Sequence, residues 1–214
     1  MKLESEGILI SLKPFNEKDA VGRIFTRDFG VLGGMLKGGV VAKKNKPLIG
    51  QVGAVAWNAR LDSQLGTFHW EAEKNLAAPL MMSADKLIYM NAAFEILVNL
   101  LPEREAYVDL YDATLELMRQ LLSDGAGAYL VWEMNLLKGL GYAMDLSKCS
   151  GCGTTTNLKY VSPKTARAVC AECGEPYDAK LYRLPVNLNV TARFLEGVCM
   201  QQGGQMPQIR KMLN

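Results

Sequence analysis

Four of the five cysteines form two close pairs, and their spacing is the strongest chemical signal in the sequence. Cys149-Ser150-Gly151-Cys152 is followed after seventeen residues by Cys170-Ala171-Glu172-Cys173. A C-x-x-C turn lets two thiolates reach one metal ion about 2.3 Å from each sulfur, and structural zinc takes four such ligands at tetrahedral corners. The pattern predicts one structural Zn²⁺, bound by Cys149, Cys152, Cys170 and Cys173 in a zinc ribbon.

The type of metal site follows from the ligands. Four thiolates leave no coordination position for a water molecule, so we expect the metal to stabilise the fold rather than to hydrolyse a substrate. Two disulfides are a minor alternative in a reducing compartment. Contact of Lys159, Lys164 and Arg167 with phosphate is a further possibility, although basic residues on a small loop are usually only solvated. Cys199 lies in a helical apolar pattern and is expected to be a core thiol.

One stretch imitates an enzyme signature. His69-Trp70-Glu71 matches the H-x-E half of the zinc deaminase motif, in which the histidine binds metal and the glutamate transfers protons. The first C-x-x-C lies almost eighty residues away, however, and is better matched by the second. The chain has one histidine and no phosphate-binding glycine motif between Gly30 and Gly39. We therefore predict a protein that is not an enzyme.

The elements before the cysteines divide into two kinds. The first 75 residues carry apolar runs of strand length separated by turn residues, with glycines inside several of them, which favours a small curved barrel of the OB-fold type. These runs are 3–13, 20–29, 31–36, 48–61 and 64–71. After residue 79 the apolar residues recur at helical spacing, beginning behind Ser83 as a helix cap.

The predicted fold class is α+β multidomain: an N-terminal OB-fold β-barrel, then an all-α helical domain with an inserted four-cysteine zinc ribbon. Apolar residues at helical spacing predict helices over 84–101, 108–122 and 129–140, in an antiparallel bundle. Two more are expected over 189–202 and 207–213. The domain boundaries that follow are 1–78 for the barrel, 79–146 with 177–214 for the helical domain, and 147–176 for the ribbon.

Composition and charge narrow the class of protein. The chain has 214 residues, 49% of them hydrophobic, and a net charge of +2, which excludes a disordered or collagen-like chain. Counted by segment, the charge is +3 over 1–80, −6 over 81–147 and +5 over 148–214. No membrane-length apolar run or signal peptide is visible, so a cytoplasmic location is expected. Two basic ends flanking an acidic middle favour a nucleic-acid partner.

The barrel carries the residue types of a single-strand surface. Lysine and arginine neutralise phosphates, and aromatic faces stack on unpaired bases. The cations are Arg23, Arg27, Lys37, Lys43, Lys44 and Lys46. The interleaved aromatics are Phe15, Phe25, Phe29, Trp57, Phe68 and Trp70, of which most must fill the core of so small a barrel, leaving one or two exposed.

Over its whole length the sequence resembles the bacterial RecO family of DNA repair and recombination proteins. Gly7-Ile8-Leu9-Ile10, the turn with Glu17 and Asp19, Phe25 to Gly30 and Lys37-Gly38 are similar to the family's barrel. Ala59 to Asp62, Leu65 to Phe68 and Glu71 are similar to its closing strand. The helical bundle and four-cysteine ribbon then follow in the family's order.

The resemblance implies a non-catalytic recombination mediator. Such a protein binds single- and double-stranded DNA, anneals complementary strands, and works with RecR to load RecA on strands coated by single-stranded DNA-binding protein, at the nucleoid during repair. The resemblance implies that the barrel cations named above contact the DNA. The helical domain becomes the implied site for the acidic, Phe-ended tail of the coating protein, with Arg210 and Lys211 as candidate contacts. The alternative from another class is a zinc-ribbon scaffold that acts through protein contacts without DNA affinity of its own.

Overall fold

The computed structural model of the protein describes residues 1–42, 46–60 and 65–213. The chain forms two compact units, Met1–Tyr129 and Leu130–Asn214. Within the described ranges, no helix combines the length and the apolar character that crossing a membrane requires. The finer division into 1–78, 79–146 with 177–214, and 147–176 stays a prediction.

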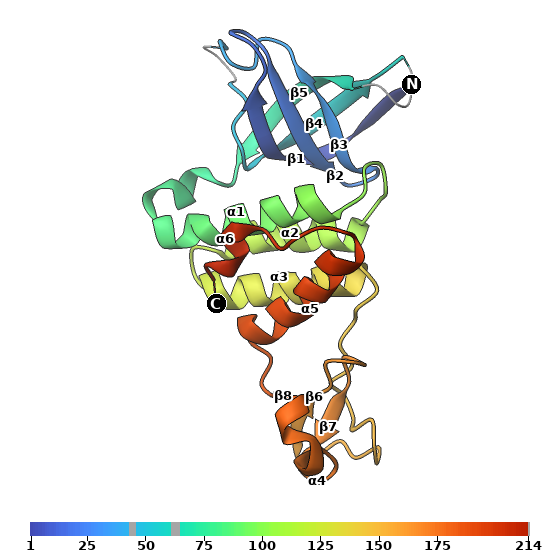
Figure 1. The fold of residues 1–214 in the computed structure, drawn as a ribbon. Coiled ribbons are helices and arrows are strands. Elements are labelled where there is room, and N and C mark those ends of the chain that lie inside the picture. The colour runs from blue at the N-terminus through green and yellow to red at the C-terminus, as the bar shows by residue number, and fades with distance from the viewer. Residues whose placement is uncertain (43–45, 61–64, 214) are drawn as a thin grey trace. The chain divides into compact units, whose positions relative to one another are not determined.

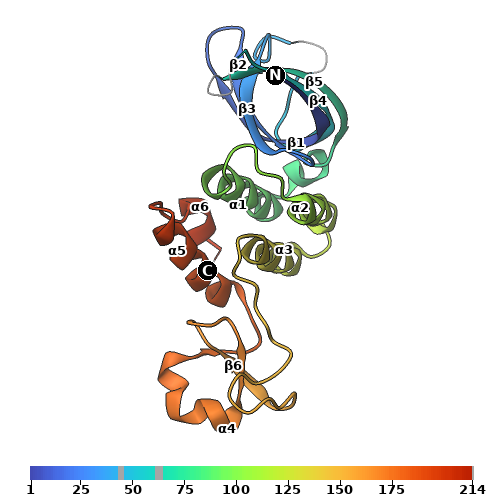
Figure 2. The same cartoon turned by 90° about the vertical axis from the view of Figure 1, so that its right-hand side faces the viewer.

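The first unit begins with the predicted five-stranded barrel, which is closed and has the strand order β1-β2-β3-β5-β4. Figure 2 looks along the barrel and shows the strands forming a ring. The long first strand closes it, because its second half pairs with β2 and its first half with β4. This topology is an OB-fold. The strands are β1 (Lys2–Pro14), β2 (Ala20–Thr26), β3 (Gly30–Leu36), β4 (Gln51–Asn58) and β5 (Gly66–Asn75).

The interior of the barrel is filled by alternate residues of its strands, as period-two burial requires. Trp57 is 1% exposed at its centre, and its indole N–H donates to the Gly33 carbonyl at 2.9 Å. Strands approach closely at Gly53, where a Cβ would lie 2.1 Å from the Glu71 carbonyl oxygen. The buried core of the barrel consists of Leu9, Ile24, Leu32, Leu36, Val55, Trp57 and Phe68.

Helices follow the barrel in the same unit: η1 (Ala78–Met82), α1 (Ala84–Leu100) and α2 (Val108–Gln120). Ser83 occupies the predicted N-cap position of α1, but its hydroxyl makes no capping hydrogen bond. The Ser83 carbonyl instead accepts the N–H groups of Lys86 and Leu87. Helix α2 packs against β2, where the Tyr111 and Phe25 rings meet edge to face at 5.6 Å.

The connection between α1 and α2 is fixed along β3. The Arg104 amide donates to the Val31 carbonyl at 3.1 Å, and the Arg104 guanidinium lies 4.8 Å from the Trp57 ring. Gly30 is required here, because its φ is +64° and a Cβ would lie 1.8 Å from the Glu105 carbonyl oxygen. One end of the barrel is thereby covered by the helical part of its own unit.

The second unit holds most of α3 (Gly125–Gly139), which begins in the first unit, together with α5 (Leu188–Gln201) and α6 (Gln208–Lys211). These helices run from yellow to red in Figure 1. They are joined by a buried ion pair, in which Arg210 Nε donates to Glu133 Oε1 at 2.5 Å and Arg210 Nη2 donates to Glu133 Oε2 at 2.8 Å. Both side chains are 0% exposed.

Between α3 and α5 the chain forms the predicted ribbon. Its elements are β6 (Leu158–Val161), β7 (Ala168–Cys170), α4 (Ala171–Gly174), η2 (Glu175–Lys180) and β8 (Tyr182–Arg183). The three strands make one sheet in the order β7-β6-β8. Strand β8 lies outside the predicted span 147–176, so the ribbon sheet extends to Arg183.

Candidate metal centre and nucleic-acid interface

The four predicted ligands come together at one point of the ribbon. The Sγ atoms of Cys149, Cys152, Cys170 and Cys173 all lie within 4.8 Å of one another, and Cys152 Sγ is 3.7 Å from Cys170 Sγ. Bonds of about 2.3 Å to a tetrahedral zinc ion would place neighbouring sulfurs about 3.8 Å apart. The cluster therefore has the size of a four-thiolate metal site, and these four thiols suit a bound metal ion.

Local backbone geometry positions each of the two cysteine pairs. The first pair sits in a turn that Gly153 leaves with a φ of +80°, and the Gly151 amide donates to Cys149 Sγ at 3.4 Å. The second pair spans the junction of β7 and α4, where the Cys173 amide donates to Cys170 Sγ at 3.5 Å. Amide donors stabilise thiolates, so each turn favours the form of cysteine that binds metal.

The electrostatics of the cluster favour a bound cation. Backbone amides of Cys170 and Cys152 lower the pKa of the Cys149 thiol to about 6. The neighbouring thiols Cys170, Cys152 and Cys149 raise the pKa of Cys173 to about 12. Four thiols this close cannot all ionise unless a positive charge compensates them. Cys199 is separate: it is buried in α5, and burial raises the pKa of its thiol.

The predicted DNA contacts of the barrel differ from one another in their surroundings. Arg23 is paired with Glu103 at 2.5 Å, and Arg27 with Asp112 at 3.1 Å, and each arginine side chain stays about two-fifths exposed. Lys37 and Lys46 are exposed. Lys43 and Lys44 lie outside the described residues. The two arginines are thus surface cations with acidic neighbours from the helical part of the unit.

The outer face of β2 and β3 is half open. In register, Val21 lies opposite Met35 and Arg23 opposite Gly33, and all four are partly exposed. The other half is covered, because Phe25 packs on Tyr111 and Val31 bridges to Glu103. The open half is a strip of sheet with Arg23 on it and Lys37 directly beyond the end of β3.

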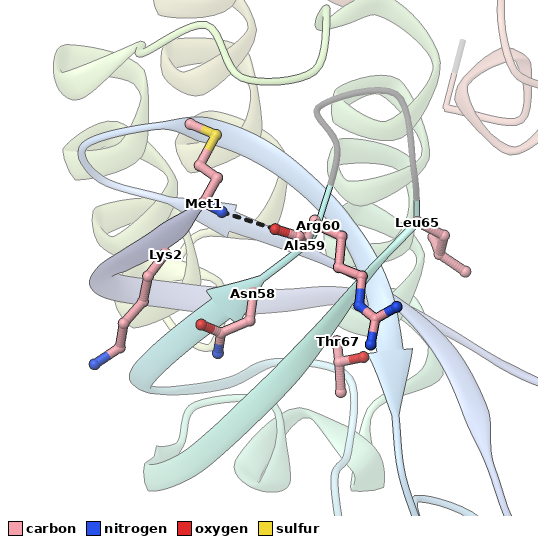
Figure 3. Close-up of a pocket in the computed structure, with 7 residues that line it drawn as sticks. All are labelled: Met1, Lys2, Asn58, Ala59, Arg60, Leu65 and Thr67. Atoms are coloured by element: carbon pink, nitrogen blue, oxygen red, sulfur yellow. Dashed lines mark hydrogen bonds between the residues drawn. The ribbon is translucent and has the colours of Figure 1, made fainter.

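A second basic place on the barrel was missed by sequence reasoning. It is a hollow of about 500 Å³. Figure 3 shows its lining residues, among them the cations Lys2 and Arg60. The Met1 amino group donates to the Ala59 carbonyl at 2.8 Å. The remaining lining residues are Asn58, Leu65 and Thr67. Strand register could have found it, since Lys2, Asn58 and Thr67 lie in one row across β1, β4 and β5.

Next to this hollow, the outer face of β1, β4 and β5 has the opposite charge, and the two regions meet where Lys2 pairs with Glu4. A shallow hollow there is lined by Glu4, Glu6, Glu71 and Glu73 beside His69, whose Nε2 is 3.0 Å from Glu71 Oε1. These carboxylates would repel phosphate. His69 and Glu71, the residues of the deaminase pattern, therefore belong to an acidic sheet surface, whereas the group that could hold a metal ion among the described residues consists of four thiols.

The two candidate contacts near the C-terminus, Arg210 and Lys211, differ in exposure. Arg210 is 0% exposed and bonded to Glu133 and to the Leu188 carbonyl, the latter at 2.7 Å. Its guanidinium could meet an acidic tail only after leaving Glu133. Lys211, the next residue, is exposed.

Comparison with known proteins identifies the family. The model of the C-terminal region of recombination protein O matches residues 82–202. A DNA repair protein RecO from a Ruegeria species is 36% identical over 86% of this chain and 78% of its own length. The RecO of Rhodospirillum rubrum is 32% identical over 96% of this chain and 92% of its own, and that of Mesorhizobium japonicum is 38% identical over 88% and 75%. The chain therefore belongs to the RecO family of DNA repair and recombination proteins.

Proposed function

We propose that the protein is a non-catalytic recombination mediator that binds single- and double-stranded DNA and anneals complementary strands. Together with RecR it would help to load RecA on strands coated by single-stranded DNA-binding protein, in the cytoplasm at the nucleoid. The observation that carries the proposal is the family membership, which rests on similarity over most of the chain and most of each relative.

The charge distribution of the barrel supports a DNA-binding role. The open strip of β2 and β3 with Arg23, the exposed Lys37 and Lys46, and the hollow with Lys2 and Arg60 carry basic residues, while the part of the β1-β4-β5 face with Glu4, Glu6, Glu71 and Glu73 is acidic. We infer that DNA contacts the basic places and avoids the acidic face. Arg27, Lys43 and Lys44 belong to the same proposal as contacts. A basic surface screens the repulsion between two strands and leaves their bases free to pair.

The metal is proposed to be a single structural zinc ion. Thiolates are the ligands zinc takes in closed sites, and the spacing and size of the cluster fit it. Cys149, Cys152, Cys170 and Cys173 would hold the ion, which supplies folding free energy to the ribbon and no open position for a reactant. This role supports a protein without catalytic activity.

The proposed partners are RecR and the acidic tail of single-stranded DNA-binding protein. Lys211 of α6 is exposed, and it is the proposed contact for the tail. Arg210 would contact the tail only in a state in which its side chain has left Glu133, because Glu133 holds it in the interior.

Annealing of complementary strands coated with their binding protein tests the function. We expect Lys37→Glu/Lys46→Glu to slow annealing and to lower the salt slope of DNA binding by about 0.7–0.9 for each phosphate that is no longer neutralised. The matched control is Lys138→Glu/Lys180→Glu, which reverses two exposed charges of the second unit. Unchanged annealing and an unchanged salt slope in the barrel variant would remove these lysines from the mechanism.

A scaffold that acts only through protein contacts is the second candidate, favoured by the acidic face and the ion pairs that occupy Arg23 and Arg27. Binding of the unmodified protein to an oligonucleotide of arbitrary sequence separates the two. Salt-dependent binding supports the mediator, and no binding at about 50 mM salt, where phosphate contacts are strong, supports the scaffold.

A further inference from the structure

The barrel region contains six aromatic residues that could stack on bases, and the structure separates them by exposure. Phe25, Trp57 and Phe68 are at most 6% exposed. Phe29 and Trp70 are partly buried against the barrel core. Phe15 is 66% exposed, at the turn between β1 and β2. It is the one of the six whose ring is largely open to solvent.

The turn that carries Phe15 is held by a network of hydrogen bonds. The Phe15 amide donates to the Asp19 carbonyl at 2.9 Å, and Asn16 Oδ1 accepts the amides of Lys18 and Asp19 at 2.8 and 2.7 Å. Asp19 Oδ1 in turn accepts the Gly38 amide at 2.8 Å. The backbone that presents the ring is thereby ordered before any ligand arrives, which lowers the entropy cost of binding.

The second strand connection at this end is tied to the same turn. The Val40 amide donates to the Lys18 carbonyl at 2.9 Å, and Val41 is 54% exposed. Figure 1 shows this end of the barrel pointing away from α1 and α2. The turn and the start of the β3–β4 connection therefore form one open rim.

The charges around Phe15 suit a phosphodiester chain. Lys13, Lys18 and Lys37 are exposed on the rim. Of its two carboxylates, Asp19 is engaged by the Gly38 and Asn16 donors, which lower its pKa, and Glu17 is exposed. A lone exposed aromatic is ordinary on a protein surface. A ring on a fixed turn among three lysines is the combination that proteins use for single strands.

We propose that Phe15 is a stacking platform for one unpaired base of single-stranded nucleic acid, with Lys13, Lys18 and Lys37 placed for the phosphates on either side. A duplex hides its base faces in the stack, so this contact selects single strands. The proposal rests on the DNA-binding function proposed above and assigns to this rim the part of it that recognises bases.

The test compares two strands that differ only in their bases. One is a fluorescein-labelled oligothymidylate of about twelve nucleotides, within the site size of one OB-fold, and the other is an abasic strand of the same length. We expect Phe15→Ala to weaken binding of the thymidylate strand by roughly 5-fold to 150-fold, the range measured for one stacked base. Binding of the abasic strand should not change, because the phosphate contacts remain.

Two further variants make the result specific. Phe15→Trp should keep the affinity, and its added indole fluorescence should be quenched by the thymidylate strand only. Met82→Ala removes another highly exposed apolar side chain of the same unit, 93% exposed, and should change neither affinity.

The outcomes distinguish the two proposals. If the unmodified protein binds neither strand, both the DNA-binding function and the stacking site are overturned. If it binds and Phe15→Ala binds the thymidylate strand equally well, the stacking site alone is overturned. An equal weakening on both strands would also overturn stacking, since the abasic strand has no base to stack.

Discussion

Neutralising Glu133 should destabilise the second unit strongly. Glu133 and Arg210 are both 0% exposed, and Glu133 Oε2 also accepts the Thr191 hydroxyl at 2.6 Å. Glu133→Gln keeps the size of the side chain but leaves the Arg210 guanidinium charged in the interior. Removing one partner of a buried ion pair costs about 3–5 kcal/mol, because the remaining charge stays desolvated and loses that opposite charge.

Thermal unfolding and hydrogen exchange measure this cost. A destabilisation of that size lowers the melting temperature by roughly 6–20 °C, at about 2–4 °C per kcal/mol for a chain of this length. Exchange should accelerate at the amides of α5 and α6 and stay unchanged in the barrel. The control is Asp178→Asn, which breaks the 2.9 Å pair with Arg183, where the two side chains are 41% and 69% exposed. Exposed pairs contribute about 0–1 kcal/mol.

A double variant completes the test. Glu133→Leu/Arg210→Met removes both charges, and replacement of a buried pair by apolar residues is often neutral or stabilising. We expect it to recover at least half of the stability that Glu133→Gln removes. A cost of Glu133→Gln no larger than that of Asp178→Asn, or a double variant less stable than the single one, would show that the buried charge of Arg210 is not the source of the destabilisation.

Three further predictions concern the ribbon and the barrel. Cys170→Ser should abolish binding of one zinc equivalent and unfold the ribbon, as metal analysis and exchange at β6 would record, whereas Cys199→Ser should leave the metal content unchanged. Gly30→Ala should lower the free energy of unfolding in urea by about 2–5 kcal/mol, because Gly30 has a positive φ and a Cβ there would collide with the Glu105 carbonyl. Gly38→Ala should lower it by only about 1–2 kcal/mol, because φ is +69° but no atom lies within 4 Å of the added Cβ. The hydrogen bond from the Gly38 amide lowers the pKa of the Asp19 carboxyl below 3.8. The ionised carboxylate therefore stabilises the fold above pH 3.8, and this stabilisation disappears as the pH falls through the pKa of the folded state. The difference in urea midpoint between wild type and Asp19→Asn should stay constant above pH 3.8 and shrink below it.

The barrel and the cluster of four cysteines were predictable because their signals are local. Period-two burial and turn residues mark the strands, and two C-x-x-C turns mark a site whose ligands are paired within four residues. The closed ring confirms the barrel, and the four thiols form a cluster that could hold a metal ion. Strand β8 escaped prediction because two residues carry no periodic pattern.

The surroundings of the cations were not predictable, because the partners are distant in sequence. Glu133 lies 77 residues from Arg210, and Glu103 lies 80 residues from Arg23. The sequence shows Arg210 beside Lys211 in a basic segment, yet one is buried and the other exposed. Only the packing of α6 decides which of two neighbouring basic residues turns inward.

The way in which the ribbon is attached has a consequence for how the protein can change over evolution. The chain enters beside Asp145, which bridges to Arg167, and leaves through β8, which pairs with β6. Both ends of the insertion are thus fastened to its own sheet, and the exit also packs on a helix, because the Tyr182 ring meets Phe194 of α5 edge to face at 5.9 Å. The part of the module beyond this contact can be lengthened or shortened without shifting the register of α3 against α5. Relatives with a smaller ribbon that retains this contact could therefore keep the Glu133–Arg210 pair and the helical core intact.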